Sequence, residues 1–499
     1  MMYLGVDCGT QSTKVVVFDT QKAAVIAQGE SPHELIGGGN GRQEQHPKWW
    51  IQAFREAFQN ALSGGAFQAM DIDAVGVSGQ QHGLVVLDDS GDVIRPAKLW
   101  CDTETAEQNA EIVAALGGTK GCIDTLGLAV ATGYTASKLL WLKQNEPDNF
   151  AQVAHILLPH DYLNYWLTGE YVMEYGDASG TGLLDIRQRC WSDAALATID
   201  DPDRLRVMLP TLIEAQQAVG TVRSEVSLEL GLRDDVLVSS GGGDNMMGAI
   251  GTGNIEQGVV TASLGTSGTL YAYSDQAPDI KHPLIAPFCS SSNGWLLLIC
   301  TMNLTGAVNH YRDLFGWDLT QMQQAVERSP IGAQGLTLLP FLNGERVPAL
   351  PNSSASLLGM NADNLTPDNI MRSALEGVTF GLRLGMDLLR GSGIDSQQLR
   401  LIGGGANSPL WRQMMADVMN CPVVCPTSTE SAALGAAIQA HWCHLNQQGQ
   451  FTSLKALCER FSTLNTDQAV SPNPDNVARY EQAYQRYRQQ LLALYPESI

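Results

Sequence analysis

Two distant stretches of this chain repeat one pattern: an apolar run, a short Gly-Thr turn and a second apolar run. The first covers residues 4–17 with Gly9 and Thr10 in the turn, and the second covers residues 259–272 with Gly265 and Thr266 in register. Each pattern is typical of a β-hairpin. The repeat therefore predicts an α/β chain with two similar halves, each built around one copy of the hairpin.

The turns of both hairpins have the composition of a phosphate-binding site. Glycine lets the backbone approach an anion, neighbouring N–H groups form a concave nest, and hydroxyl groups add donors without adding negative charge. Two such turns are suited to holding one polyphosphate from opposite sides. The candidate nucleotide-binding residues of the hairpins are Gly9, Thr10, Gln11, Ser12, Lys14, Gly265, Thr266 and Ser267.

One position distinguishes the two hairpins. The first carries Asp7 where the second carries Ser263. A carboxylate beside phosphates repels them unless a hard cation such as Mg²⁺ lies between, so Asp7 is a candidate metal ligand, direct or through water.

Composition indicates a globular protein of two domains. A chain of 499 residues, with 44% hydrophobic and 16% charged residues, is too long for one ordinary core and carries no signature of disorder. We place the boundary so that the domains are residues 1–250 and 251–499. Short β-rich runs alternate with helical stretches, which indicates mixed sheets. The clearest expected elements are helices over 47–62, 370–389, 432–442 and 477–494 and strands over 74–78, 85–87, 236–238 and 399–401.

Charge and cysteine usage limit the partners and the compartment. A net charge of −22 argues against nucleic acid or an anionic membrane as the main partner. No apolar run approaches the length of a membrane span, and the ten cysteines are scattered, which favours a soluble cytoplasmic protein with reduced thiols. Cys421 and Cys425 lack a second ligand pair nearby, so zinc is a poor interpretation of them. The oligomeric state stays open, with a homodimer as one option.

A glycine run in the middle of the chain carries the best candidate for a catalytic base. The expected strand over 236–238 leads through Gly241, Gly242 and Gly243 to Asp244 at the start of a small-residue helix. A helix N-cap alone would explain an aspartate there. Three glycines clear space that a cap does not need, so we interpret Asp244 as a general base for an attacking hydroxyl group and as a second candidate metal ligand.

A third glycine-rich loop follows the expected strand over 399–401. Backbone without side chains suits stacking of a purine and ribose, although a lone triple glycine is a weak signal. The candidate adenosine-binding residues of this loop are Gly403, Gly404, Gly405, Ala406 and Asn407.

In order and spacing, these four sites resemble the FGGY family of carbohydrate kinases over residues 3–445. Within that family the stretch Ser78–Gly83 is most similar to the Gly-Gln-x-His-Gly sugar motif of the xylulokinase subfamily, although Gln81 stands where bacterial members often have Met. The resemblance implies two actin-like (ribonuclease H-like) ATPase domains with an ATP and sugar cleft between them. It also implies Mg²⁺-dependent phosphoryl transfer from ATP to the terminal hydroxyl of D-xylulose, giving D-xylulose 5-phosphate.

The sugar is expected to meet polar side chains that both donate and accept hydrogen bonds. The candidates are Gln81, His82, Asp102, Asp244 and Asn245. Trp49 and Trp50 are either a wall of the cleft or helix packing. The stretch 100–104 departs from the Trp-Asn-Asp-x-Arg often found in the family, which bears on the identity of the ketose.

Three other interpretations remain open on the sequence. Another ketose or polyol, such as ribulose, sedoheptulose or erythritol, would keep the reaction and change the substrate. An actin-like ATPase or filament protein would use the same scaffold without a sugar. A sugar-sensing pseudoenzyme would bind without transfer, which the presence of both Asp7 and Asp244 argues against.

Overall fold

The first sheet has a central antiparallel hairpin extended by parallel strands. The computed structural model describes residues 1–280, 282–342 and 344–496. The strand order is β14-β15-β6-β1-β2-β3, in which β1, β2 and β3 are antiparallel and β1, β6 and β15 are parallel. The strands are β1 (Met2–Cys8), β2 (Ser12–Asp19), β3 (Ala24–Pro32), β6 (Ile72–Gly79), β14 (Ala218–Thr221), β15 (Leu237–Ser239) and the short β16 (Gly242–Gly243) beside β6.

The second sheet repeats this plan. Its order is β19-β20-β18-β17-β23-β24-β25, with β17, β18 and β20 antiparallel and β17, β23 and β24 parallel. The strands are β17 (Gly258–Leu264), β18 (Gly268–Ser274), β19 (Ala286–Cys289), β20 (Trp295–Thr301), β23 (Ser396–Ile402), β24 (Val423–Pro426) and β25 (Leu464–Val470). Both predicted hairpins are therefore confirmed, as β1–β2 and β17–β18, and each is the centre of a ribonuclease H-like sheet.

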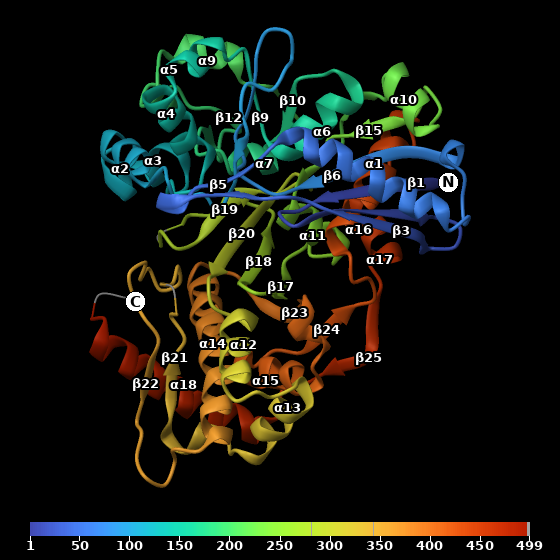
Figure 1. Ribbon diagram of the computed structural model, residues 1–499. Helices are drawn as coiled ribbons and strands as arrows, with labels where there is room; N and C mark the ends of the chain where they lie inside the picture. Colours follow the sequence, from blue (N-terminus) through green and yellow to red (C-terminus); the bar gives the residue numbers. More distant parts are fainter. Residues whose placement is uncertain (281, 343, 497–499) are drawn as a thin grey trace.

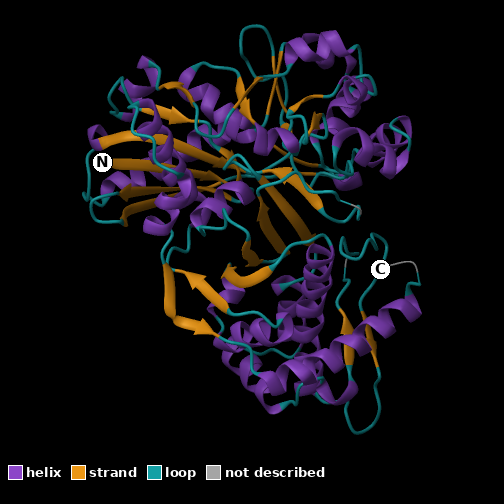
Figure 2. Ribbon diagram, turned by 180° about the vertical axis from the view of Figure 1, so that it is seen from behind, coloured by secondary structure: helices purple, strands orange, loops and turns teal. Residues whose placement is uncertain are grey.

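Helices cover both sheets, and many of them lie between β8 (Ala97–Lys98) and β14 (Figures 1 and 2). Those of the first half are α1 (Pro47–Ser63), α2 (Ala106–Ala115), α3 (Gly118–Leu126), α4 (Thr135–Asn145), α5 (Pro147–Gln152), α6 (Pro159–Thr168), α7 (Tyr175–Ser179), α8 (Asp193–Leu196), α9 (Pro202–Met208), α10 (Ser224–Leu230) and α11 (Asp244–Gly251). Those of the second half are α12 (Thr305–Leu314), α13 (Leu319–Arg328), α14 (Pro367–Gly391), α15 (Pro409–Met419), α16 (Ser431–Gln447), α17 (Leu454–Phe461) and α18 (Pro474–Leu494). Among the described helices none is both long and apolar enough to cross a bilayer.

The remaining strands are short and lie outside the two large sheets. They are β4 (Ile36–Gly37), β5 (Gln43–Gln45), β7 (Val85–Leu87), β9 (His155–Leu157), β10 (Val172–Glu174), β11 (Leu184–Asp185), β12 (Cys190–Trp191), β13 (Thr211–Ile213), β21 (Thr337–Leu339) and β22 (Ser356–Leu358). Of these, β4, β5 and β8 form one small sheet beside the first hairpin, and Gln45 at its end donates a hydrogen bond to the carbonyl of Thr10 over 2.7 Å.

Helix α16 comes from the C-terminal part of the chain but packs on the first sheet, against β1 and β6, and on α11 (Figure 1). The approach is very close, because a Cβ atom at Gly5 would lie 1.9 Å from the Ala433 carbonyl and one at Gly435 would lie 1.8 Å from the Met247 carbonyl. Glycine is required at both positions. Division of the chain at residue 250 stays a prediction, and in space α16 and α17 share a core with the first sheet.

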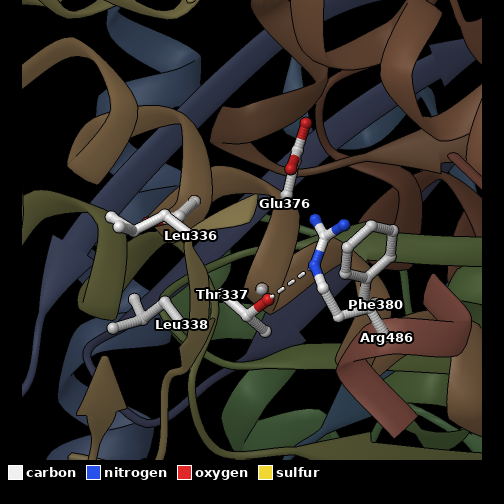
Figure 3. Close-up of a pocket in the computed structure, with 8 residues that line it drawn as sticks. Leu336, Thr337, Leu338, Glu376, Phe380 and Arg486 are labelled. Atoms are coloured by element: carbon white, nitrogen blue, oxygen red, sulfur yellow. Dashed lines mark hydrogen bonds between the residues drawn. The ribbon is translucent and has the colours of Figure 1, made fainter. Parts of the chain in front are cut away.

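The closing helix α18 runs along the outside of the second half (Figure 2) and carries an apolar stripe on one face. Its members Tyr480, Tyr484, Tyr487 and Leu491 are all buried. Figure 3 shows Arg486 of this helix, whose Nε donates to Thr337 Oγ1 over 3.3 Å. Arg486 and Thr337 are among the residues that line the pocket drawn in this figure. None of the lining residues is a predicted site residue, so we assign the pocket to the packing of the helices.

Candidate active site

The end of the first hairpin and the start of α11 bring the two candidate metal ligands together. Asp7 pairs in register with Ser78 of β6, and Ser78 pairs with Gly242 on its other side. The Ser78 hydroxyl donates to Asp7 Oδ1 over 2.8 Å. Because these parallel strands end at one edge of the sheet, Asp7 at the end of β1 and Asp244 at the start of α11 share one site.

The glycines before Asp244 allow close packing of the backbone, whereas the sequence analysis interpreted them as clearing space around the carboxylate. A Cβ atom at Gly241, whose φ is +72°, would lie 2.5 Å from the carbonyl of Val77. A Cβ atom at Gly243 would lie 2.7 Å from Cγ of Gln81. The bare backbone therefore lets the Asp244 turn lie against β6 and against the predicted sugar motif.

The carboxylate of Asp244 is held by the residue that follows it. Asp244 Oδ1 accepts from the backbone N–H of Asn245 over 2.8 Å and from its Nδ2 over 2.9 Å. The same Nδ2 donates to Gln81 Oε1 over 3.0 Å. Asp244, Asn245 and Gln81 thus form one hydrogen-bonded group, which joins three of the predicted sugar contacts.

Burial and neighbouring negative charges make both carboxyl groups weak acids. Burial, opposed by the Ser78 hydrogen bond and increased by the charge of Glu430, raises the pKa of Asp7 to about 6. Burial first and the charge of Asp7 second raise the pKa of Asp244 to about 7. A carboxyl group with a pKa near neutral is suited to accept a proton during catalysis.

His82 lies beside this group in a fixed, neutral form. Its Nδ1 lies 2.7 Å from the carbonyl of Gly180, so Nδ1 carries the hydrogen and Nε2 is left as an acceptor. The ring stacks on Tyr134 with centroids 4.5 Å apart. Burial, together with the charge of Lys138, lowers the pKa of His82 to about 3.

The first turn is tied to the sugar motif by side chains that the sequence did not assign. Thr10 Oγ1 donates to Gln80 Oε1 over 3.1 Å and accepts from Nε1 of Trp100 over 2.9 Å. Trp50, predicted as a cleft wall or as packing, is fully buried in the core and donates to Gln45. The packing interpretation is therefore confirmed for Trp50, while Trp49 is half-buried.

The charged and polar residues after the first turn meet carboxylates in this structure. Lys14 forms an ion pair with Glu430 at 2.9 Å, just before α16, and the Ser12 hydroxyl donates to Glu30 over 2.6 Å. Gln11 is exposed, whereas Gly9 is half-buried. Their contacts with a nucleotide stay predictions.

The second turn and the glycine loop 403–407 lie against each other. A Cβ atom at Gly403 would lie 2.9 Å from the backbone of Leu264, and one at Gly405 would lie 2.8 Å from the Leu264 side chain. The carbonyl of Gly265 accepts from both the N–H and the hydroxyl of Thr305 at the start of α12. Thr266, Gly403, Gly404 and Asn407 are exposed, Ser267 is half-buried, and Ala406 is buried.

Asp102 belongs to a separate ion cluster. Its side chain is fully buried, and its Oδ2 accepts from the backbone N–H of Gln43 over 2.8 Å and from Lys98 Nζ over 3.3 Å. Lys98 also pairs with Glu44 at 3.2 Å and with Glu104. The predicted sugar contact of Asp102 gains no support from this geometry, and we leave Asp102 out of the proposed sugar site.

The sequence analysis missed two cations near the site. Lys138 on α4 donates to the carbonyl of His82 over 2.6 Å. Arg346, from the second half, places its guanidinium 5.8 Å from the Trp100 ring centroid. A lysine inside the apolar stretch of a helix was the signal for Lys138, whereas the reach of Arg346 follows only from the fold.

Comparisons with known proteins agree with this architecture. The profile of the FGGY family of carbohydrate kinases matches residues 2–251 with its N-terminal domain and residues 260–443 with its C-terminal domain. A xylulose kinase of Haemophilus influenzae is 49% identical over 99% of this chain and 100% of its own length. A xylulose kinase of Streptomyces coelicolor is 38% identical over 88% of this chain and 87% of its own.

Among solved structures, a "xyloylose kinase" from Brucella ovis superposes with a TM-score of 0.91 at 30% identity, covering 99% of this chain and 100% of its own. The two sheet-rich halves of the fold agree with these matches. The chain belongs to the FGGY family of carbohydrate kinases and is an ATP-dependent sugar kinase.

Proposed function

We propose that this kinase transfers the γ-phosphoryl group of ATP to the terminal hydroxyl of D-xylulose, giving D-xylulose 5-phosphate and ADP. The observation that carries the proposal is the hydrogen-bonded group of Asp244, Asn245 and Gln81, in which the pKa of the Asp244 carboxyl is raised. A neutral His82 lies next to this group. The names of the relatives, at up to 49% identity over the full chain, support D-xylulose as the sugar.

Asp244 is the proposed base. As the oxygen of the terminal hydroxyl attacks phosphorus, its proton moves to a carboxylate oxygen of Asp244, the bond from phosphorus to the ADP oxygen breaks, and ADP leaves with the electron pair. Asn245 and Gln81 orient the carboxylate and the sugar. His82 Nε2 accepts a hydrogen bond from a second sugar hydroxyl.

The carboxylate pair fits a divalent cation. Asp7 raises the pKa of Asp244 by repulsion, so the two groups favour a shared positive charge between or beside them. Asp7 and Asp244 would hold Mg²⁺, directly or through water. When bound, the metal neutralises charge on the phosphates.

The two turns are the proposed phosphate grips. Backbone N–H groups and hydroxyls at Gly9–Ser12 and Gly265–Ser267, with Lys14, would surround the polyphosphate, and residues 403–407 would carry the adenosine. The close packing of Gly403 on Leu264 supports a single nucleotide site shared by the second turn and this loop. A cytoplasmic location and a homodimer stay predictions.

A coupled ADP-release assay with Mg·ATP tests the proposal across ketoses, their isomers and polyols. We expect the highest turnover with D-xylulose. Preference for ribulose, sedoheptulose or erythritol would keep the reaction and replace the sugar. Sugar-independent ATP hydrolysis, with no phosphorylated sugar by mass spectrometry, would overturn the proposal.

A further inference from the structure

Among the residues that the structure describes, Lys98 and Lys138 are the two fully buried lysines, and their surroundings differ. Lys98 meets the carboxylates of Glu44, Asp102 and Glu104. Lys138 Nζ instead donates to two main-chain carbonyls, that of His82 over 2.6 Å and that of Gly133. Within the described part of the chain, no carboxylate lies at ion-pair distance from Lys138. The charge of Asp102 favours the ammonium form, but only from beyond ion-pair distance. A buried ammonium without a direct ion pair is costly, so its retention at this position needs a reason.

We find the reason in the backbone of His82, whose carbonyl Lys138 binds. His82 has a φ of +65°, in the left-handed region that residues with a Cβ atom rarely adopt. Such a backbone persists only where the surroundings fix it. The carbonyl of His82 also accepts from Thr135 Oγ1 over 3.2 Å, so α4 holds this peptide with two donors from its first turn.

The ring of His82 is fixed from the other side. Nδ1 donates to the carbonyl of Gly180, and the ring contacts those of Tyr134 and Phe288, with centroids at 4.5 Å and 5.6 Å. Backbone and ring are thus each held by separate contacts. If the backbone contact were lost, the peptide could leave the left-handed region and Nε2 would change direction.

We propose that Lys138 is the positioning residue of the sugar site: it binds the carbonyls of His82 and Gly133 and thereby directs His82 Nε2, as a neutral acceptor, at a hydroxyl of the ketose. This inference rests on the proposed function, because it assigns a role to His82 in binding the sugar. Lys138 itself does not touch the reacting atoms.

The charge of Lys138 acts in the same direction as its hydrogen bonds. After burial, it is the next largest cause of the lowered pKa of His82, and the charge of Arg346 adds to it. The remaining groups packed on the ring, Tyr134 and Phe288, are uncharged. Burial lowers the pKa of Lys138 to about 7, and both of its protonation states keep N–H donors for the two carbonyls.

The test compares Lys138→Met with Lys143→Met. Lys143 lies on the same helix and also donates to a carbonyl, that of Ile199 over 2.6 Å, so it is a matched control for the loss of one such contact. D-Xylulose binding is measured by calorimetry without nucleotide, and the KM values for D-xylulose and ATP are measured separately. For Lys138→Met we expect about tenfold weaker sugar binding and a similar rise in sugar KM, with ATP KM within about twofold. The control should leave sugar binding unchanged.

Thr135→Val covers the case in which Lys138→Met does not fold. It removes the second donor to the same carbonyl, and we expect sugar KM to rise about threefold with ATP KM unchanged. Sugar binding that is unaffected in the folded variants, or equal losses for sugar and ATP, would overturn the role of Lys138. A wild-type protein that does not bind D-xylulose would instead overturn the proposed substrate, and the comparison would then use the sugar that supports turnover.

Discussion

The two hairpins share a backbone plan and differ in what lies beside them. At the end of β1, Asp7 pairs with Ser78 of the neighbouring parallel strand, which donates a hydrogen bond to it. At the matching place in the second sheet, Ser263 pairs with the apolar Ile402. The same topological position therefore carries an acid and its donor in one half, and an uncharged pair in the other.

The segments that follow these parallel strands differ in the same way. After β6 come Gln80, Gln81 and His82, which reach Thr10 and Asn245. After β23 comes the bare loop of Gly403–Gly405, packed on Leu264. Under the proposed function, the two turns hold one polyphosphate, the first half adds the acid–base and sugar residues, and the second half adds the adenosine loop.

The largest effect is expected where the two halves differ most, at the base. Asp244→Asn keeps the acceptor for Asn245 but cannot take a proton, so kcat should fall by about 10² to 10⁴. Sugar binding, measured by calorimetry, should change by less than about threefold. A variant with near-normal kcat would show that another group accepts the proton.

A smaller effect is expected from exchanging the residue that distinguishes the hairpins. Asp7→Ser makes the first hairpin like the second, and we expect activity to fall about 10- to 100-fold with a higher Mg²⁺ concentration for half-maximal rate. The converse change, Ser263→Asp, adds a carboxylate without a partner and should raise ATP KM about tenfold with the Mg²⁺ requirement unchanged. The Mg²⁺ concentration for half-maximal rate is measured by titration for both variants. An equal change in the two variants would contradict the proposed difference between the hairpins.

The sequence predicted those parts of the molecule that depend on local pattern. Both hairpins, the strand at 85–87 and the helix at 47–62 were found, since alternation and turn residues act over a few positions. It also placed Asp244 at a helix start after a glycine turn. The helix expected at 432–442 formed as well, but its docking on the first sheet depends on glycines such as Gly5, more than 400 residues away.

The sequence did not predict side-chain contacts between residues that lie far apart in the chain. Asp102 follows a short strand near the sugar motif, and its carboxylate accepts a hydrogen bond from the backbone of Gln43, 59 residues earlier, a contact that local spacing does not indicate. A sugar contact was predicted for His82, but its left-handed backbone was not. The contact between its carbonyl and Lys138, 56 positions away, was not predicted either. Such pairings are set by tertiary packing rather than by local spacing.

The pH dependence of stability tests whether the acid pair is under strain without metal. Because the folded-state pKa of Asp244 is raised to about 7, the folded protein binds its proton more tightly than the unfolded chain does. Stability should therefore fall as pH rises from about 4 to about 7. Asp244→Asn should stabilise the protein by about 1–2 kcal/mol at pH 8 and by little at pH 4. The value at pH 8 is smaller than the full pKa shift would give, because the side chain is only half-buried and solvent screens its charge.

Thermal unfolding in EDTA at pH 4 and pH 8 measures this difference, and Ser263→Ala is the control from the second hairpin. The control should show the same stability change at both pH values. A destabilised Asp244→Asn at pH 8 would mean that Asp244 is better satisfied in the folded state than its environment indicates.

The smallest effect is expected from removing a single hydroxyl in the turns. Thr266 is exposed, and its backbone carbonyl is held by the N–H groups of Leu304 and Gly306, so the turn should keep its shape in Thr266→Val. Loss of one neutral hydrogen bond to phosphate should raise ATP KM about threefold and leave sugar KM unchanged. Thr10→Val should act more widely, because Thr10 also bonds Gln80 and Trp100 beside the sugar motif, and both KM values should rise. Steady-state kinetics with each substrate varied in turn separates the two, and identical patterns would mean that the first turn is no more connected to the sugar site than the second.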